Sequence, residues 1–400
     1  MCLFLFSSAT IFNKNPTFLL KIPGGYSLPL LLQYVKNHCK GGINMRKYYV
    51  DNIRWMTIVL VVIYHVIYMF NAVLTDGVIG PITTVHWQDA IQYILYPWFM
   101  VILFLISGMC AKYYLDTHSV KEFIRARTRK LLVPSTIGVL VFGWAQGYFN
   151  MTFSGGFRHI PNTLPGFILY LIMAVSGIGV LWTIQVMWIL SLVLVLVRKI
   201  EKGRLYAFCE KVNMPILLLL GIPVWGAAQI LNTPVICVYR FGIYGFCFLL
   251  GYYVLAHEEI TERLKKHCVV LLVAAVFLAI AYVKLYYGQD YASAPVVNCP
   301  LSIAYCWIAC LAVIGCAKRW GNRTNSFFTF MTRKCFGLYV FHYLALSAAA
   351  YTLTRYTHFS GPAIYLLSAI ASFAGGFLLY EIISRIPLVR WCVLGMKKES

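Results

Sequence analysis

Residues 90–111 read AIQYILYPWFMVILFLISGMCA and contain no Asp, Glu, Lys or Arg. A run of about 20 apolar residues is long enough to cross the ~30 Å hydrocarbon core of a bilayer as a helix. Runs of this kind recur along the chain and predict an all-α fold, a polytopic membrane helical bundle of about ten transmembrane helices. The expected spans are 55–74, 90–111, 131–149, 164–197 (a re-entrant hairpin plus one crossing), 214–231, 236–256, 268–287, 301–317, 336–353 and 363–383.

The composition excludes a water-soluble fold. Of the 400 residues, 60% are apolar and 12% are charged, whereas soluble domains carry about 25% charged residues. The 13 cysteines include no CxxC pair and lie mostly in the expected spans and cytoplasmic loops. They are therefore interpreted as small apolar packing residues, and no metal site is predicted.

The net charge of +21 is explained by topology. Nearly all Lys and Arg residues after Met45 lie in loops on one side of the expected spans, and the opposite loops hold only Arg158 and Arg355. Loops rich in Lys and Arg stay on the cytoplasmic side of a membrane. Both termini are therefore expected to be cytoplasmic, and the charge does not predict a nucleic-acid partner.

The first 44 residues differ from the rest, since they hold one modest apolar stretch (Leu28–Val35) and no acid. Codons for Lys40, Gly41 and Gly42 would be purine-rich, as a ribosome-binding site ahead of Met45 would be. We therefore expect residues 1–44 to be a non-native or disordered extension and residues 45–400 to form one transmembrane domain. A secretory signal is the alternative, but no well-formed cleavage site follows an apolar core.

The first expected span carries the most informative ionisable residues. Asp51 and Arg54 are three residues apart and share a helix face, so they can pair at the cytoplasmic boundary. His65 follows Arg54 by eleven residues, which places it about 16 Å deeper and on nearly the same face. An imidazole there could accept a proton from an attacking hydroxyl. The alternative is a histidine that only joins two helices by a hydrogen bond.

A basic run follows the second span. Arg125, Arg127, Arg129 and Lys130 fall within six residues at a membrane boundary. Guanidinium groups bind phosphate in a bidentate manner, so this run suits a polyphosphate or an adenosine phosphate. On charge alone, positive-inside anchoring or contact with lipid head groups is the favoured explanation of this run.

Five further residues are candidates. Trp182 and Gln185 follow a glycine-rich turn, although Trp182 could also belong to an interfacial belt. Arg240 begins a span, where it could instead extend to the head groups. His342 is a second histidine within a span, and Glu381 is expected to pair with Arg385, four residues later on the same helical face.

These motifs, in this order, resemble the acyltransferase-3 family of bacterial membrane O-acyltransferases, from about Arg46 to Lys398. The resemblance rests on Asp51 with the Arg54–His65 spacing, Phe104–Gly108, the basic run into Pro134, Leu181–Trp182, Phe248–Tyr252, Gly337–Leu338–Tyr339 with His342, and Glu381–Arg385–Ile386–Pro387 with Arg390. The chain departs from the family pattern at Thr183, where Phe is common, at Gln185, and at Lys130, where Arg is usual.

The resemblance implies an enzyme of the bacterial cytoplasmic membrane. It would move an acyl group, most often acetyl, from cytoplasmic acyl-CoA to a hydroxyl of an extracytoplasmic glycan or small-molecule acceptor. On this interpretation His65 is the essential base or handles the acyl group, and Arg54 and Asp51 shape the cytoplasmic mouth. Arg127, Arg129 and Lys130 would hold the CoA phosphates, with no metal required.

Two other functions remain open from the sequence. A multi-span transporter or flippase would have a similar composition, although inverted internal repeats are not visible and several buried carboxylates are lacking. An inactive membrane partner in glycan assembly is the third interpretation, against which the intact Arg54–His65 spacing argues. The sequence specifies neither the acceptor nor the oligomeric state.

Overall fold

The computed structural model describes residues 46–74, 77–234 and 238–396. The predicted extension 1–44 and the predicted start at Met45 lie outside the described residues. The chain divides at Tyr48 into two units, and the features below belong to the unit Tyr49–Ser400. Helices dominate this unit, and its only strands among the described residues form one short antiparallel pair, β1 and β2.

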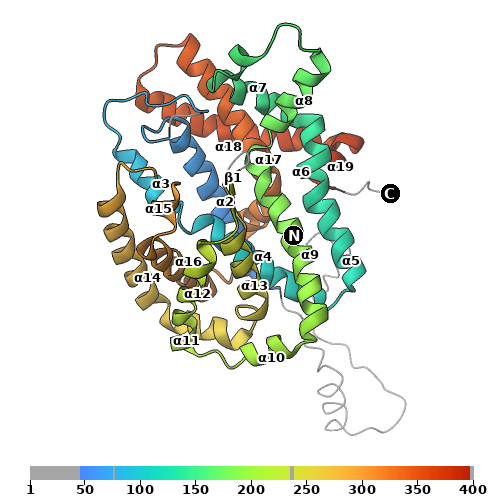
Figure 1. The fold of residues 1–400 in the computed structure, drawn as a ribbon, viewed down its shortest axis with the longest axis vertical. Coiled ribbons are helices and arrows are strands. Elements are labelled where there is room, and N and C mark those ends of the chain that lie inside the picture. Colours follow the sequence, from blue (N-terminus) through green and yellow to red (C-terminus); the bar gives the residue numbers. More distant parts are fainter. Residues whose placement is uncertain (1–45, 75–76, 235–237, 397–400) are drawn as a thin grey trace, which may run out of the picture. The chain divides into compact units, whose positions relative to one another are not determined.

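The elements follow one another along the chain as Figure 1 shows. In the first half these are α2 (Tyr48–Met69), η1 (Trp87–Asp89), α3 (Ala90–Leu95), α4 (Phe99–Leu115), α5 (Val120–Arg127), η2 (Thr128–Leu132), α6 (Val133–Gly138), η3 (Val139–Gly143), α7 (Trp144–Phe153), η4 (Gly156–His159), α8 (Gly166–Ser176), η5 (Gly179–Leu181) and α9 (Trp182–Glu201). The second half comprises α10 (Arg204–Cys209), α11 (Met214–Leu219), α12 (Gly221–Ala228), β1 (Asn232–Pro234), β2 (Val238–Arg240), α13 (Phe241–Tyr253), α14 (Glu258–Tyr286), α15 (Ala294–Val297), α16 (Pro300–Trp320), α17 (Ser326–Tyr356), α18 (Gly361–Arg385) and α19 (Pro387–Leu394).

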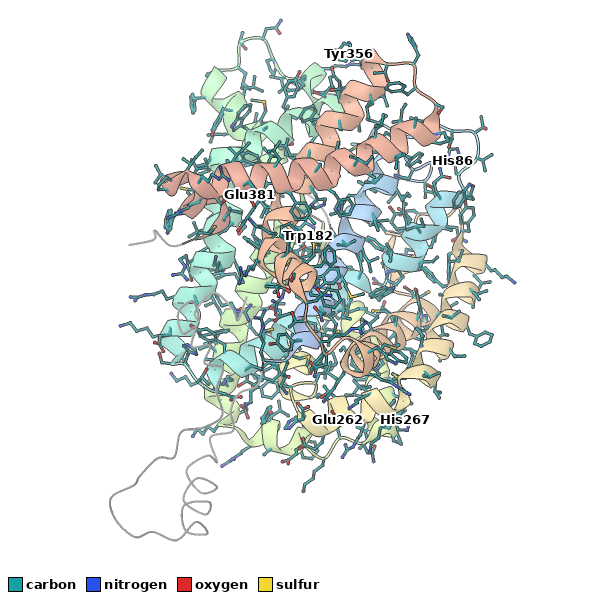
Figure 2. All side chains as sticks on the ribbon, turned by 180° about the vertical axis from the view of Figure 1, so that it is seen from behind. His86, Trp182, Glu262, His267, Tyr356 and Glu381 are labelled. Carbon is teal, nitrogen blue, oxygen red and sulfur yellow. The ribbon has the colours of Figure 1, made fainter. Side chains whose placement is uncertain are left out.

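The all-α polytopic membrane fold is confirmed. Within the described part of the chain, eight helical segments are long and apolar enough to cross a membrane. The predicted spans 214–231 and 236–256 correspond to shorter apolar helices, α11–α12 and α13. His86 and Tyr356 lie at one end of the bundle, and Glu262 and His267 lie at the other (Figure 2).

The chain turns back within residues 164–197, as the predicted hairpin requires. Helix α8 follows the long segment Val120–Phe153 in the same order, since the Tyr170 hydroxyl donates to the Leu140 carbonyl and Asn150 donates to the Ser176 carbonyl. Helix α9 follows the same segment in the opposite order, since Gln185 donates to the Ser135 carbonyl and Trp188 donates to the Thr128 hydroxyl. The turn at Gly177–Leu181, where Gly179 has a φ of +43°, separates α8 from the helix α9.

The long segment Val120–Phe153 is irregular. Its two π-helical turns, η2 and η3, lie before and after α6. In a membrane, irregular backbone persists only where protein buries it or a cavity adjoins it. Gln185 contacts the backbone of this segment, since its Nε2 donates to the carbonyl of the buried Ser135 at 2.7 Å.

Helix α2 lies between two apolar clusters. One face, including Ile53 and Val61, belongs to the cluster formed with α4, α13, α14 and α16. The other face, including Ile58 and Val62, belongs to the cluster formed with α17, α18 and α19. Because both faces are buried, the polar residues of α2 are held at fixed depths inside the bundle.

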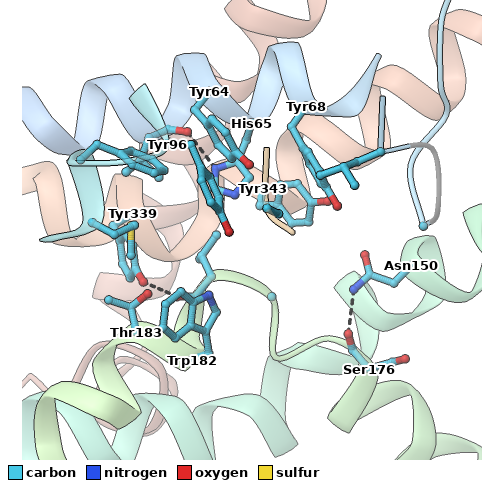
Figure 3. Close-up of a pocket in the computed structure, with 18 of the residues that line it drawn as sticks. Tyr64, His65, Tyr68, Tyr96, Asn150, Ser176, Trp182, Thr183, Tyr339 and Tyr343 are labelled. Carbon is cyan, nitrogen blue, oxygen red and sulfur yellow. Dashed lines mark hydrogen bonds between the residues drawn. The ribbon is translucent and has the colours of Figure 1, made fainter. Parts of the chain in front are cut away.

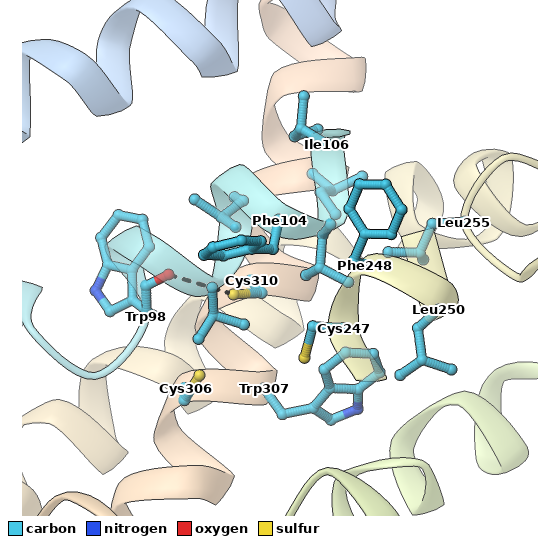
Figure 4. Close-up of a cluster of buried hydrophobic side chains, with 14 of the residues drawn as sticks. Trp98, Phe104, Ile106, Cys247, Phe248, Leu250, Leu255, Cys306, Trp307 and Cys310 are labelled. Atoms are coloured by element: carbon cyan, nitrogen blue, oxygen red, sulfur yellow. Dashed lines mark hydrogen bonds between the residues drawn. The ribbon is translucent and has the colours of Figure 1, made fainter. Parts of the chain in front are cut away.

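Helices α4 and α13 cross at two glycines from the Phe104–Gly108 and Phe248–Tyr252 motifs. A Cβ at Gly108 would lie 2.0 Å from the Phe248 carbonyl oxygen, and one at Gly251 would lie 2.0 Å from the Leu105 carbonyl oxygen. Only glycine allows this approach, which is typical of small-residue helix contacts in membranes. Around it, Cys247, Cys306 and Cys310 are buried among large apolar side chains (Figure 4), as the packing interpretation of the cysteines predicted.

Candidate active site

His65 lies on the wall of a cavity of about 500 Å³, a volume typical of small-molecule sites. The cavity is bounded by α2, by the turn between α8 and α9, by α7 and by α17 (Figure 3). Its lining also includes Gly77, Asn150 and Ala292, which lie in loops or near helix ends. The loop that contains Ala292 is joined to the His86 loop, because the Tyr287 hydroxyl donates to the His86 carbonyl at 2.6 Å.

Two histidines meet beside this cavity. Nδ1 of His342 lies 3.1 Å from the Leu338 carbonyl and 2.9 Å from the Tyr339 carbonyl. Carbonyls only accept, so this nitrogen carries the hydrogen and Nε2 of His342 is an acceptor. Nδ1 of His65 lies 3.2 Å from that Nε2 and 2.8 Å from the Val61 carbonyl, and it must therefore be a donor.

This arrangement fixes the chemistry of the His65 ring. With the hydrogen on Nδ1, Nε2 of His65 has an available lone pair, and it has no hydrogen-bond partner among the described residues. The residue lines the cavity. A base held in one tautomer by its second nitrogen is the arrangement used for proton transfer in many enzymes.

Aromatic side chains form much of the cavity wall around His65. The Tyr343 ring lies 4.9 Å from the His65 ring, and the Tyr64 ring lies 5.2 Å from it. The Tyr64 and Tyr291 hydroxyls are 3.2 Å apart, and burial raises the pKa of Tyr291, so that its phenol stays neutral. The wall can therefore exclude water and contact flat or apolar parts of a substrate without adding charge.

The opposite wall is the turn between α8 and α9. Gly179, Val180, Trp182 and Thr183 all line the cavity. The Tyr339 hydroxyl donates to the Val180 carbonyl, which satisfies a backbone group of this turn. Trp182 lies inside the bundle (Figure 2) and packs against Tyr244 at 5.7 Å, so it is not an interfacial belt residue.

A polar patch closes another part of the cavity. Asn150 lines it and donates from Nδ2 to the Ser176 carbonyl at 2.7 Å. Gln146, on the same helix, donates from Nε2 to Asn150 Oδ1 at 2.8 Å and to the Ser347 hydroxyl at 3.0 Å. These bonds join α7, α8 and α17 behind the cavity and hold the Asn150 side chain in place.

The predicted pair at the start of α2 is confirmed. Arg54 Nη1 lies 3.1 Å from Asp51 Oδ1, and Asp51 is largely buried. Arg54 Nη2 also donates to the thiol of Cys110 on α4 at 3.1 Å. The pair therefore lies between α2 and α4, well separated along α2 from His65.

The four residues of the basic run differ in how far they are exposed. Arg125 is exposed and Arg129 and Lys130 are half-buried, but Arg127 is only 6% exposed. Arg127 donates from Nη1 to the Ser107 hydroxyl at 3.0 Å and from Nη2 to the Ser107 carbonyl at 3.2 Å. It thereby joins the basic run to the Phe104–Gly108 motif.

Three other candidates lie away from the cavity lining. Gln185 contacts the Ser135 carbonyl, as described above. Arg240 is buried and donates to Asn298 Oδ1 at 2.8 Å, so it does not extend to the head groups. The predicted Glu381–Arg385 pair is wrong, because Glu381 pairs with Lys334 of α17. In this pair the carboxylate ties α18 to a neighbouring helix rather than to its own last turn.

Sequence reasoning missed most of the cavity wall. Tyr64 and Tyr68 are four residues apart and flank His65, a spacing that could have indicated an aromatic face. Thr183 and Asn150 gave no such signal, since a single polar residue in a span is common. The contact between His65 and His342 links residues 277 positions apart and required the fold.

The fold and cavity define a multi-pass membrane protein with an interior site. A family model described as an acyltransferase domain matches residues 47–381. This match covers most of the chain, so the protein belongs to the acyltransferase-3 family and is a membrane acyltransferase. No curated protein and no solved structure matches the chain.

Proposed function

We propose that this acyltransferase moves an acyl group from cytoplasmic acyl-CoA to a hydroxyl of an extracytoplasmic glycan or similar small-molecule acceptor. The acyl group that we propose is acetyl. The observation that carries the proposal is the position of His65. Its Nδ1 is held by Val61 and His342, and the residue lines a cavity of about 500 Å³. Such a base suits activation of a hydroxyl for acyl transfer.

In the proposed reaction, His65 Nε2 takes the proton from the acceptor hydroxyl as its oxygen attacks the thioester carbonyl carbon. The new C–O bond forms while the carbonyl π electrons move onto oxygen. When this intermediate collapses, the C–S bond breaks and the CoA sulfur takes the proton from His65. The sum is acyl-S-CoA plus ROH giving acyl-OR plus HS-CoA, and His65 returns to its starting state.

The donor is assigned to the end of the bundle where the cations gather. The charge distribution of the loops supports a cytoplasmic position for this end and for both termini, in the bacterial cytoplasmic membrane. The exposed Arg125 and the half-buried Arg129 and Lys130 would contact CoA phosphates. Arg127 would position this segment through Ser107, and Asp51 with Arg54 would shape the mouth.

The acceptor is assigned to the cavity. Its loop residues Gly77 and Ala292 lie on the side away from the basic run in the predicted topology. The aromatic wall and the Asn150 patch offer stacking surfaces and hydrogen bonds, which suit a hydroxyl-rich molecule.

Sealed membrane vesicles test the proposal. With labelled acetyl-CoA supplied only on the cytoplasmic face, label should appear in acceptor on the opposite face, and His65→Ala should abolish transfer while the variant remains inserted. Label that stays on the donor face, or full transfer by His65→Ala, would contradict it. His86→Ala is a matched control, because His86 lies outside the cavity lining.

A further inference from the structure

The turn between α8 and α9 places a helix N-terminus against the cavity. Helix α9 is 20 residues long, and its N-cap residue, Leu181, makes no side-chain capping hydrogen bond. The first turn of a helix has backbone N–H groups without intrahelical partners and carries the positive end of the helix dipole. Trp182 and Thr183, in this first turn, line the cavity opposite α2 (Figure 3).

Thr183 adds a second donor. It is only 1% exposed, and its hydroxyl has no hydrogen-bond partner among the described residues. Other threonines in these helices donate a hydrogen bond from their hydroxyl to the carbonyl four residues earlier, as Thr57 does to Ile53 at 2.8 Å. Leaving a buried hydroxyl unpaired is destabilising, yet the Thr183 hydroxyl is unpaired and the residue lines the cavity.

We infer that the first turn of α9 and the Thr183 hydroxyl form a donor site for the carbonyl oxygen of the acyl thioester. This inference rests on the proposed function. As the acceptor oxygen attacks, the carbonyl oxygen gains the negative charge, and the Thr183 O–H and the helix N-terminus stabilise it until the C–S bond breaks. Donors preorganised where charge develops are among the largest contributions to catalysis.

The composition of this wall favours a carbonyl oxygen, rather than a phosphate, as the group that binds there. Thr183 is flanked by Trp182 and lies near Tyr339, and no Lys or Arg lines the cavity within the described residues. A phosphate, with its permanent charge, is bound in proteins by cationic side chains such as those of the basic run. A carbonyl oxygen needs stabilisation only in the transition state, for which neutral donors suffice.

Two variants of Thr183 test the site kinetically. Thr183→Val removes the hydroxyl while keeping the shape, and it removes a buried unpaired group, so the fold should persist. Its kcat should fall about 100-fold, since one such donor contributes a factor of 10²–10³, while KM for acetyl-CoA stays within about threefold. Thr183→Ser should keep most of the activity. Thr57→Val, which loses a hydroxyl bonded within its own helix, serves as the control.

A spectroscopic measurement separates this inference from the proposed function. The probe is the ketone analogue of acetyl-CoA with a methylene between sulfur and carbonyl, and its carbonyl stretch is followed by infrared spectroscopy. Bound to the wild-type protein and to Thr183→Ser, the stretch should shift to lower frequency, and in Thr183→Val most of the shift should vanish. A bound ketone with its solution frequency, or wild-type kcat in Thr183→Val, would overturn the inference alone. Failure of the wild-type protein to bind the ketone and transfer label would overturn the proposed function.

Discussion

Nε2 of His342 lies 3.2 Å from Nδ1 of His65, and this contact joins α17 to α2 at the edge of the cavity. His342 is completely buried and anchored to two carbonyls of its own helix. Its orientation is therefore fixed before any substrate binds. The hydrogen bond between the two rings therefore also fixes the orientation of the His65 ring, which lines the cavity.

Substitution of His342 should lower the rate without eliminating it. In His342→Ala, Nδ1 of His65 loses one acceptor but keeps Val61, so the base should survive with a less fixed ring. The fall in kcat should be smaller than the factor of roughly 10²–10⁴ that a general base contributes. His342→Gln, whose amide oxygen can accept the same bond, should recover part of the loss and shift the pH–rate profile back toward that of the wild type. Equal loss in His342→Ala and His342→Gln, with an unchanged pH profile, would assign His342 a packing role only.

The crossing of α4 and α13 should not tolerate a methyl group. Gly108→Ala and Gly251→Ala each place a Cβ about 2 Å from a backbone oxygen, and overpacking of this kind costs about 1–3 kcal/mol. The midpoint of thermal unfolding in detergent should fall in both variants. Gly226→Ala is the control, because nothing lies within 4 Å of a Cβ there. An unchanged midpoint in both crossing variants would contradict the described packing.

Arg125 and Arg127 should respond differently to truncation. Arg125→Ala should raise KM for acyl-CoA, by about tenfold if one charge-assisted hydrogen bond is lost, and should leave thermal stability unchanged because Arg125 is exposed. Arg127→Ala should lower thermal stability as well, because it leaves Ser107 without its partner. Initial rates against acyl-CoA concentration and thermal unfolding of both variants check this difference. Identical behaviour of the two variants would refute it.

His257, outside the spans, should make stability depend on pH. Burial lowers the pKa of His257, although Glu210 and Glu259 act in the opposite direction. The folded state therefore favours the neutral ring, whose Nε2 donates to the Tyr206 carbonyl at 3.1 Å. This stabilisation is complete above the ordinary histidine pKa of about 6.5 and is lost as the pH falls through the lowered value. Thermal midpoints between pH 7.5 and 5 should fall less steeply in His257→Gln than in the wild type, and parallel curves would exclude His257 as the cause.

Much of the fold could be predicted from hydropathy. Residues 90–111 and 301–317 became helices because a bilayer leaves few other structures for long apolar runs. The turn at Gly177–Leu181 was predicted in outline, since glycines between two apolar stretches allow the backbone conformations of a tight turn. The contacts of Ser176 with Asn150 and of Gln185 with Ser135, which position the two arms of this hairpin, could not be predicted from the sequence.

The site was predicted in part. Spacing along α2 located the Asp51–Arg54 pair and the depth of His65, because positions on one helix have a fixed geometry. The contacts of Arg54 with Cys110 and of His65 with His342 come from other helices and could not be predicted from spacing. For the same reason Glu381 was assigned to Arg385 on its own helix, although Lys334 on α17 is the residue that it contacts.

The rate of acyl transfer in His65 variants tests the central claim most directly. In membranes with wild-type protein, His65→Ala and His65→Gln at matched levels, labelled acetyl-CoA is supplied and both labelled acceptor and free CoA thiol are measured. We predict loss of transfer by at least about 100-fold in both variants, with the proteins still inserted and their thermal midpoints near that of the wild type. Transfer at the wild-type rate in His65→Gln, which keeps the size and polarity of the side chain but has no basic nitrogen, would contradict the role of His65 as the base.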